Sequence, residues 1–487
     1  MNKVNIMIQI YSIWEKYFYI FVYQSSKLVF IRFILLMNEN SSSWGQTMKT
    51  TNIKSESGKI SLWEKLSYSG GDVASCITFG AVSSYLSYYY TDIAGISIAA
   101  VGVIFGVTRL LEALVNFLTG VAIDGSHFKG GKAKPFIYAT TIPLTIMVIL
   151  VFMVPDLSAH GKVTFAFITY LLFCILYAVN NTGYGTLLSL LTSDVKERRV
   201  LNSFKVFGSG TGSLLVSFLT LPLVALCGVQ GRFSFAPVAV IYGVINLVLL
   251  GNCSISCRER VQTDGEARMS LKESLHCAAK SRSWILLCVI GACVMVVMIL
   301  QNQIIMYYAK YILMDESRAT LILTIYTMTQ LLAALFMDKM LNWLGNRNCM
   351  LFGFGVFLVL TVVMFAFRKK LILFCIFMLL AGLGKSMATS PCYAICADTI
   401  DEVEALTGKR PQGVMTSFMM CTMKAGTAIA GVVFSVVLHA GHYAAETAQQ
   451  SPEAICAIYM NLFWLPMLIV AGCMVLAFFF KRQSIQK

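Results

Sequence analysis

Residues 283–311 read SWILLCVIGACVMVVMILQNQIIMYYAKY, and no charged side chain occurs among them before Lys310. A run of this length is sufficient to cross the hydrocarbon core of a bilayer, because a membrane-spanning helix needs about 20 apolar residues. Similar apolar runs recur with short breaks from Tyr68 to the end of the chain. The repetition predicts an all-α membrane protein that crosses the bilayer many times.

The composition supports the same class of protein. Of the 487 residues, 57% are hydrophobic and only 13% are charged, and the mean hydropathy is +0.73. Soluble domains carry about a quarter charged residues. A soluble enzyme, a long disordered chain and a secreted disulfide scaffold are therefore excluded.

The apolar runs divide into twelve predicted transmembrane helices, arranged as two halves of six. The longest break, residues 254–282, is strongly basic, and we interpret it as a cytoplasmic linker between residues 61–253 and residues 283–487. The spans are expected at residues 68–91, 98–122, 136–155, 163–189, 203–227, 233–253, 283–311, 317–337, 348–367, 371–390, 412–438 and 456–480.

Residues 1–60 differ from the rest and are interpreted as an N-terminal extension. Charged side chains such as Glu15 and Lys16 interrupt the apolar pattern, so no window of about 20 residues there reads as a span. Two interpretations stay open for this segment. One is an over-called start codon, with Met37 or Met48 as the true start, and the other is an amphipathic surface helix.

Basic side chains distinguish the two sets of loops. The loops after spans 2, 4, 6, 8 and 10 hold 16 Lys and Arg residues, whereas the opposite loops hold six. Because basic residues accumulate in cytoplasmic loops, we expect a multi-pass protein of the plasma (inner) membrane with both termini in the cytoplasm. The same rule accounts for the net charge of +14 without a nucleic-acid partner.

The sequence shows no catalytic or metal-binding motif. It contains no Walker A loop, HExxH or GxSxG, and its 15 cysteines form no CxxC pair and lie mostly in apolar runs. Such cysteines behave as small hydrophobic residues. We therefore expect neither an enzyme nor a cofactor, metal site or disulfide framework.

The two predicted halves share an internal repeat. Asp124 and Asp338 follow spans 2 and 8, while Ser203 and Ser417 open spans 5 and 11, and both pairs have the same separation in sequence. A common offset is what a parallel repeat predicts. This layout resembles the major facilitator superfamily. Acidic and basic residues at the helix–loop junctions suggest a cytoplasmic gate made of Asp124, Asp338, Asp398, Lys409 and Arg410.

Five charged residues lie well inside the predicted spans, namely Asp72, Arg109, Glu112, Lys385 and Lys424, whereas Lys205 and Lys310 lie near span ends. A charge at the middle of a bilayer costs roughly 3 kcal/mol unless it is paired, hydrated or neutralised. These residues are therefore candidates for function. The sequence indicates no partner for Lys385.

Arg109, Glu112 and Asn116 share one face of span 2, because they stand at positions i, i+3 and i+7. An Arg109–Glu112 pair could simply hold helices together. The alternative is a pair between Glu112 and Lys424, which would link the two halves and break during transport.

Two further polar groups have both structural and functional interpretations. Asp72 follows two glycines near the start of span 1, so it is either a helix N-cap or a ligand-binding carboxylate. Asn180, Asn181 and Tyr184 of span 4 form either interhelical hydrogen bonds or ligand contacts.

Several stretches resemble the glycoside–pentoside–hexuronide:cation symporters, the family that includes the melibiose permeases. Residues 85–96 read YLSYYYTDIAGI and residues 109–116 read RLLEALVN. Residues 131–135 read GKAKP and residues 197–205 read ERRVLNSFK. The most specific match is residues 397–414, ADTIDEVEALTGKRPQGV. The resemblance covers the chain from about residue 60 to its end.

The resemblance implies a central sugar site beside a cation site. Asp72 and Asn181 match two sugar-binding acids, and Lys205 lies at or next to a conserved arginine. Glu112 and Asn116 match the paired cation carboxylates, and Lys424 matches the lysine that neutralises them. Asn116 and Asn181 stand where the family has acids, and Gly185 replaces a stacking tryptophan. The identity of the transported sugar and the identity of the coupling ion therefore both stay open.

These observations predict a monomeric secondary transporter that imports a glycoside or related sugar by alternating access. The alternatives are a transporter of a non-sugar or amphiphilic solute and a non-transporting membrane sensor. A sodium site needs several oxygen ligands, and span 2 offers only one carboxylate. We therefore favour H⁺ over Na⁺ as the coupling cation, with uncoupled diffusion as the alternative.

Overall fold

The computed structural model describes residues 60–480, apart from 125, 127, 129, 193, 262–270, 409–411, 446 and 448. Residues 59–126 and 132–487 form one unit, and residues 1–58 and 127–131 are grouped apart from it. The predicted N-terminal extension lies outside the described residues except for Ile60.

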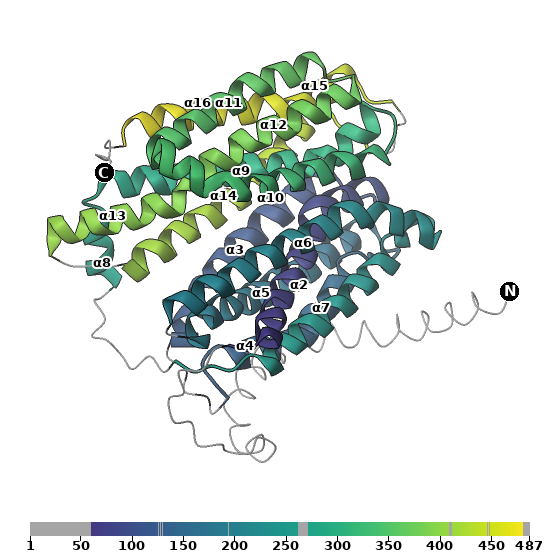
Figure 1. The fold of residues 1–487 in the computed structure, drawn as a ribbon. Helices are drawn as coiled ribbons and strands as arrows, with labels where there is room; N and C mark the ends of the chain where they lie inside the picture. The colour runs from purple at the N-terminus through teal and green to yellow at the C-terminus, as the bar shows by residue number, and fades with distance from the viewer. Residues whose placement is uncertain are drawn as a thin grey trace. The chain divides into compact units, whose positions relative to one another are not determined.

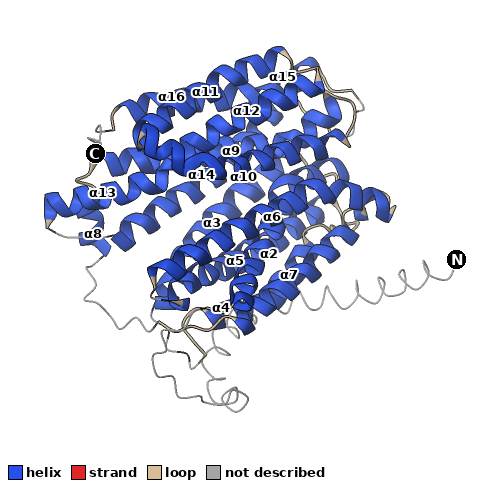
Figure 2. Cartoon of the chain, viewed as in Figure 1, coloured by secondary structure: helices blue, strands red, loops and turns tan. Residues whose placement is uncertain are grey.

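All regular elements within the described residues are helices (Figure 2). The α-helices are α2 (Leu62–Tyr88), α3 (Ile98–Asp124), α4 (Lys134–Leu150), α5 (Ala159–Leu191), α6 (Val195–Cys227), α7 (Ala236–Ser256), α8 (Leu271–Ala278), α9 (Arg282–Tyr311), α10 (Arg318–Leu344), α11 (Asn346–Ala366), α12 (Leu371–Thr389), α13 (Pro391–Thr407), α14 (Gln412–Ala440), α15 (Pro452–Tyr459) and α16 (Leu465–Phe478). Short π or 3₁₀ segments are η2 (Tyr89–Ile93), η3 (Gly231–Phe233) and η4 (Met460–Trp464).

Serine side chains begin several of these helices. The hydroxyl oxygens of Ser61, Ser158, Ser281 and Ser451 each accept a hydrogen bond from the backbone N–H three residues later. This bond satisfies an N–H that has no partner inside the helix. The polar breaks seen in the sequence therefore act as helix starts.

The helices match the apolar runs of the sequence. A helix covers most of each of the twelve predicted ranges, and within the part of the chain that is described nine helices are long and apolar enough to cross a membrane. The helix α4 is apolar but shorter. An all-helical membrane fold is therefore confirmed, whereas the number of crossings stays a prediction.

The same packing pattern occurs twice along the chain (Figure 1). The helix α2 packs on α6 and α7, as α9 packs on α14 and α16. The helix α5 packs on α3 and α4, as α12 packs on α10 and α11. Two glycines allow the α2–α6 and α9–α14 pairs to pack closely. A Cβ at Gly212 of α6 would collide with the backbone oxygen of Val73 in α2, and a Cβ at Gly426 of α14 would collide with that of Ala292 in α9. Gly212 and Gly426 have the same separation in sequence as Asp124 and Asp338, so they belong to the same repeat.

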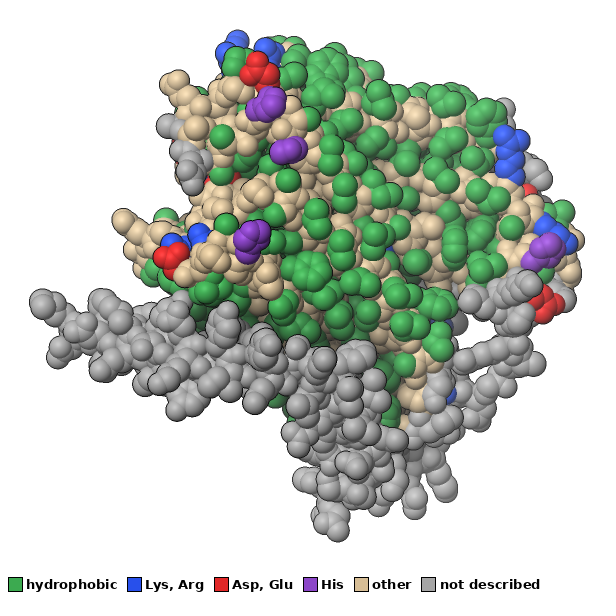
Figure 3. Space-filling view, turned by 180° about the vertical axis from the view of Figure 1, so that it is seen from behind, with side chains coloured by type: hydrophobic (Ala, Val, Ile, Leu, Met, Phe, Trp, Pro, Cys, Tyr) green, Lys and Arg blue, Asp and Glu red, His purple; other side chains and the backbone are tan. Residues whose placement is uncertain are grey.

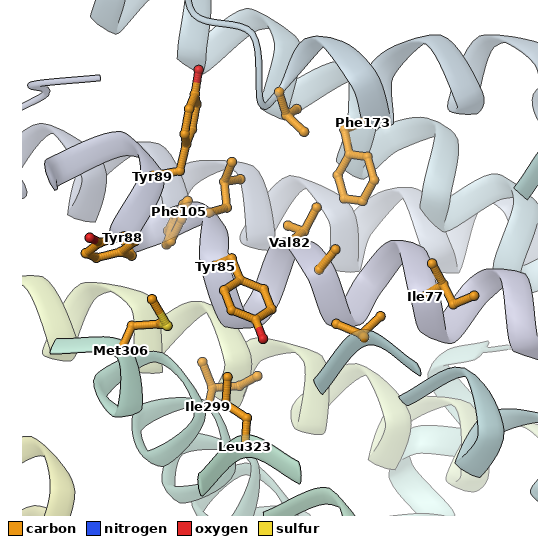
Figure 4. Packing of buried hydrophobic residues seen from close by; sticks show 14 of the residues in the cluster. Ile77, Val82, Tyr85, Tyr88, Tyr89, Phe105, Phe173, Ile299, Met306 and Leu323 are labelled. Atoms are coloured by element: carbon orange, nitrogen blue, oxygen red, sulfur yellow. The ribbon is translucent and has the colours of Figure 1, made fainter. Parts of the chain in front are cut away.

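The two sets of helices meet along three seams, where α3 contacts α14, α6 contacts α10 and α2 contacts α9. Large aromatic side chains are buried along α2 and η2, as Figure 4 shows for Tyr85 of α2 and Tyr89 of η2. The outer surface is different, since Figure 3 shows hydrophobic side chains over most of one face. An apolar exterior is the surface expected of a protein in lipid.

The start of the predicted linker is bound to the first helices. The Arg260 guanidinium donates to both carboxylate oxygens of Glu64 at 2.8 Å, and these hydrogen bonds raise the pKa of Arg260 above its ordinary value. The Glu259 carboxylate accepts backbone N–H bonds from Lys132, Ala133 and Lys134 at 2.6–2.9 Å. These contacts fix the linker against the ends of α2 and α4.

Candidate functional site

The Glu112 carboxylate of α3 is the centre of the first charged cluster. Its side chain is 1% exposed, and it accepts a hydrogen bond from the Arg109 Nη1 at 2.8 Å and from the Lys424 Nζ at 2.6 Å. Both pairings considered from the sequence are therefore present in one structure. The second joins α3 to α14, which lie far apart in the sequence.

Aromatic rings hold the other members of this cluster. The Arg109 guanidinium carbon lies 4.9 Å from the ring centroid of Phe79 and 5.6 Å from that of Tyr170. The Lys424 ammonium lies 5.7 Å from the ring centroid of Tyr177. Rings attract cations through their negative faces, so the two cations are positioned by α2 and α5 as well as by Glu112.

Asn116 lies one helical turn after Glu112. Its Nδ2 donates to the Glu112 backbone oxygen at 2.8 Å, and its Oδ1 accepts from the Thr182 hydroxyl of α5 at 2.9 Å. The amide therefore joins α3 to α5. An asparagine offers one neutral oxygen where a carboxylate would offer two charged ones.

Asp72 lies inside α2 rather than at its start. The N-cap of α2 is Ser61, and Asp72 follows it by several helical turns. The N-cap interpretation of Asp72 is therefore wrong. Asp72 is 7% exposed, and its carboxylate interacts with the Lys205 ammonium and the Ser209 hydroxyl, both of α6.

Tyr184 packs beside Asp72. Its ring stacks on Tyr68 with centroids 4.7 Å apart, and its hydroxyl donates to the Tyr68 backbone oxygen at 2.8 Å. A Cβ at Gly71 would lie 2.7 Å from the Tyr184 ring, so glycine admits the ring at that point. The Lys205 ammonium lies 5.6 Å from the ring centroid of Tyr184, so the tyrosine links Asp72's helix to Lys205.

The two neighbouring asparagines of α5 have different surroundings. Asn180 is buried, and its Nδ2 donates to the Thr140 hydroxyl at 2.9 Å, which is the interhelical bond considered from the sequence. Asn181 is half-buried, and Gly185 is exposed with no atom within 4 Å of a built Cβ. The α5 surface that carries Asn181 and Gly185 is thus open.

The predicted cytoplasmic gate is only partly visible. Asp398 of α13 accepts a hydrogen bond from the Asn346 Nδ2 at 2.9 Å. Asp124 is the last residue of α3 and Asp338 lies in α10, but the side chains of both lie outside the described residues, as do Lys409 and Arg410. The gate stays a prediction.

The sequence reasoning missed a second charged cluster, centred on Asp92 in η2. The side chain of Asp92 is fully buried, and it accepts hydrogen bonds from the Lys310 Nζ at 2.8 Å and from the Tyr311 hydroxyl at 2.6 Å. The Tyr443 hydroxyl, just after α14, donates to its other oxygen at 2.8 Å. Asp92 thus joins η2 to the end of α9 and to the segment that follows α14.

Further contacts surround Asp92. The Tyr307 hydroxyl lies 3.1 Å from the Ser87 hydroxyl and 2.9 Å from the Thr91 hydroxyl, and the Tyr88 hydroxyl donates to Glu316 at 2.8 Å. The cluster lies at the end of α2 opposite Glu64, about 40 Å away at about 1.5 Å per residue. The sequence signal was available, because Asp92 belongs to the YLSYYYTDIAGI stretch and Lys310 ends a span.

Comparisons with known proteins agree with this architecture. A family profile described as "MFS/sugar transport protein" matches residues 67–483. The isoprimeverose transporter of Lactiplantibacillus pentosus is 32% identical over 87% of this chain and 89% of its own length. A putative glycoside/cation symporter of Escherichia coli is 25% identical over 87% of this chain and 92% of its own. The crystal structure of the nucleoside transporter NupG shares the fold, with a TM-score of 0.61 and 15% identity over 85% of this chain and 97% of that one.

Proposed function

The chain belongs to the MFS/sugar transport protein family, and from this premise we propose that it imports a glycoside or related sugar by alternating access, coupled to a cation. The observation that carries the proposal is the buried Glu112, which binds Arg109 on its own helix and Lys424 on α14. A buried ion pair contributes little net stability, because removing both charges from water is costly. The presence of such a pair between the two sets of helices is explained if the pair breaks and re-forms during transport.

We propose twelve crossings, in two halves that span residues 61–253 and 283–487 and are joined by residues 254–282. The repeated packing of α2–α7 and α9–α16 and the shared offset of the sequence repeat support this division. The excess of basic residues on the linker side supports termini in the cytoplasm and a plasma-membrane location. A monomer suffices, since one chain supplies both halves of the site.

The proposed sugar site lies on α2, α5 and α6. Asp72 accepts hydrogen bonds from sugar hydroxyls, because a carboxylate can bind two adjacent donors. Lys205 and Asn181 supply further polar contacts to the sugar. The Tyr184 ring stacks on Tyr68 and lies under the Lys205 ammonium, so it positions side chains around Asp72. The open surface at Asn181 and Gly185 supports access of a solute from this side.

Glu112 is the proposed coupling residue, and a proton is the favoured ion. Span 2 offers the Glu112 carboxylate and the Asn116 amide, whose Oδ1 already accepts a hydrogen bond from the Thr182 hydroxyl. Sodium prefers several oxygen ligands, whereas a proton needs a single basic atom. Transient protonation of Glu112 would release Lys424 and so free α14 from α3.

The Asp92 cluster is the proposed closed gate of this conformation. It joins η2 to α9 and to the segment after α14, at the end of α2 farthest from the linker. With the proposed topology, that end faces the outside. The cytoplasmic gate is proposed to use Asp124, Asp338, Asp398, Lys409 and Arg410, of which Asp124 and Asp338 stand at equivalent positions of the repeat.

The function is tested with purified protein in proteoliposomes and a panel of radiolabelled glycosides. We expect accumulation when a proton gradient is imposed, and Glu112→Gln should abolish accumulation against a gradient, because it cannot take up a proton. Exchange of the same glycoside at equal concentrations should persist in this variant. Accumulation driven by sodium alone, in the presence of a protonophore, would overturn proton coupling. Absence of uptake for every glycoside would overturn the sugar assignment.

A further inference from the structure

The turn between α11 and α12 carries three consecutive basic residues, Arg368, Lys369 and Lys370. The Tyr308 hydroxyl near the end of α9 donates to the Arg368 backbone oxygen, so the turn lies at the same end of the protein as the Asp92 cluster. In the proposed topology this end faces the outside. Basic residues are disfavoured in the loops of that side, so three of them in one turn require an explanation.

The other basic residues in the loops of that side are already bound by the protein. Arg232 and Arg318 each form an ion pair with an exposed aspartate, and the Lys162 ammonium donates to a backbone oxygen at 3.1 Å. Within the described part of the chain, no acid forms an ion pair with any residue of the turn 368–370. The charge of this turn is therefore available to an anion from outside the protein.

Aromatic rings hold the Arg368 guanidinium in place. The guanidinium carbon lies 4.5 Å from the ring centroid of Phe365 and 5.6 Å from that of Tyr459, and Nη1 donates to the Phe365 backbone oxygen at 3.1 Å. The ring of Trp464, which is 45% exposed, lies 5.1 Å from that of Phe365. Tyrosine and tryptophan gather at the level of the lipid headgroups. The turn therefore lies where the hydrocarbon region ends and the phosphate groups begin.

Apolar side chains flank the basic turn. Val362 of α11 is 53% exposed and Ile372 of α12 is 76% exposed, while Lys369 and Lys370 between them are exposed as well. On the face drawn in Figure 3, charged side chains lie mainly at the margins of the hydrophobic surface. Cations beside an apolar surface fit an amphiphile with an anionic head and a hydrocarbon tail.

We propose that Arg368, Lys369 and Lys370 bind the headgroup of an anionic phospholipid, in the leaflet at the Asp92 end of the protein. The guanidinium, fixed by its rings, has further N–H donors for a phosphate oxygen, and the two lysines add positive charge around it. The acyl chains lie along the exposed apolar side chains of α11 and α12. A zwitterionic lipid carries the same phosphate without net charge, so it binds this turn less strongly. The inference does not depend on which solute is transported.

The test uses Trp464 as a local reporter in the full-length protein. The protein is reconstituted into phosphatidylcholine vesicles that contain either brominated phosphatidylglycerol or brominated phosphatidylcholine, since bromine on the acyl chains quenches a tryptophan in contact with the lipid. Subtraction of the signal of Trp464→Phe separates this residue from the other tryptophans. We expect phosphatidylglycerol to compete for the surface at Trp464 about fivefold better than phosphatidylcholine.

A double variant removes the charge of the two lysines. Lys369→Gln with Lys370→Gln should lower the preference to about twofold or less, whereas Lys369→Arg with Lys370→Arg keeps the charge and should keep the preference. Arg258→Gln with Lys280→Gln removes two exposed charges of the linker, at the other end of the protein, and is the charge-matched control. The preference is a ratio between two lipids, so a loss of folded protein does not imitate its decrease.

Equal quenching of Trp464 by the two lipids in the wild-type protein overturns the inference. An unchanged preference in the double Gln variant of the turn overturns it as well. An equal loss of preference in the control variant would assign the effect to net charge rather than to this turn. Salt at about 1 M should weaken the preference, because it screens exposed charges, and a preference that is insensitive to salt would contradict binding through charge.

Discussion

At the scale of single residues, the buried charges of this protein fall into two kinds. Glu112 and Asp92 each accept hydrogen bonds from cations of distant helices. Asp72 interacts with Lys205 and Ser209 of α6, and Lys385 donates to the neutral acceptors Tyr326 and Gln301. In the proposed mechanism, the first kind holds the closed conformation together. We propose that Asp72, of the second kind, binds the solute.

Asp72→Asn should weaken sugar binding more than tenfold. The substitution keeps the shape of the side chain but removes the charge, and a hydrogen bond to a charged group contributes about 1.5–3 kcal/mol. Equilibrium binding to purified protein measures the effect. Asp156→Asn, which changes an exposed acid, is the matched control. Equal affinity in Asp72→Asn and wild type would assign Asp72 a purely structural role.

At the scale of the helices, small residues decide which pairs approach closely. Gly212 and Gly426 occupy equivalent positions of the repeat, at the α6–α2 and α14–α9 contacts. Small residues favour such contacts in membranes, since little else drives helices together in lipid. The two sets of helices therefore share equivalent close contacts as well as an equivalent pattern of polar residues.

Gly212→Val should destabilise the protein. The new side chain would collide with backbone atoms of α2, and overpacking of this kind costs about 1–3 kcal/mol. Thermal unfolding in detergent should show a lower midpoint. Gly251→Val is the control, because no atom lies within 4 Å of a Cβ built at Gly251. Equal midpoints for the two variants would contradict the close α2–α6 contact.

At the scale of the whole molecule, the Asp92 cluster and the linker contacts lie at opposite ends of α2. Asp92 is bound by Lys310, Tyr311 and Tyr443, which belong to the later part of the chain. The linker contact, Glu64 with Arg260, stays within the earlier helices. Opening of the molecule at the Asp92 end would break the first set of bonds and keep the second.

Asp92→Asn should favour that opening. It replaces a charged acceptor of four hydrogen bonds, three of them from the later part of the chain, with a neutral amide, so the closed state loses stability relative to the open one. Amide hydrogen exchange of residues 88–96 and 306–312 should become faster. Asp315→Asn, on an exposed acid near the same end, should leave these rates unchanged. Unaltered exchange in Asp92→Asn would contradict its role as a gate.

Much of this protein follows from the sequence alone. The apolar runs predict the helices because a span must bury its own backbone hydrogen bonds in lipid, and ionisable residues within them stand out because each is costly there. Such local properties predict the membrane class and the positions of the helices. They also identify the candidate residues Asp72, Glu112, Lys385 and Lys424. The sequence predicts a link between Glu112 and Lys424 because each is a charged side chain that needs a partner inside the membrane.

The tertiary structure decided which of these residues meet. Asp92 and Lys310 are far apart in the sequence, and no local pattern indicates that η2 packs against the end of α9. Only the structure showed that Asp72 lies inside α2 and that the Tyr184 hydroxyl is bonded to the backbone of α2. The packing of α9, α10 and α12 showed that Gln301 and Tyr326 accept hydrogen bonds from Lys385. The physical reason is that hydrophobicity sets which segments enter the membrane, whereas side-chain packing between helices sets their rotation and register.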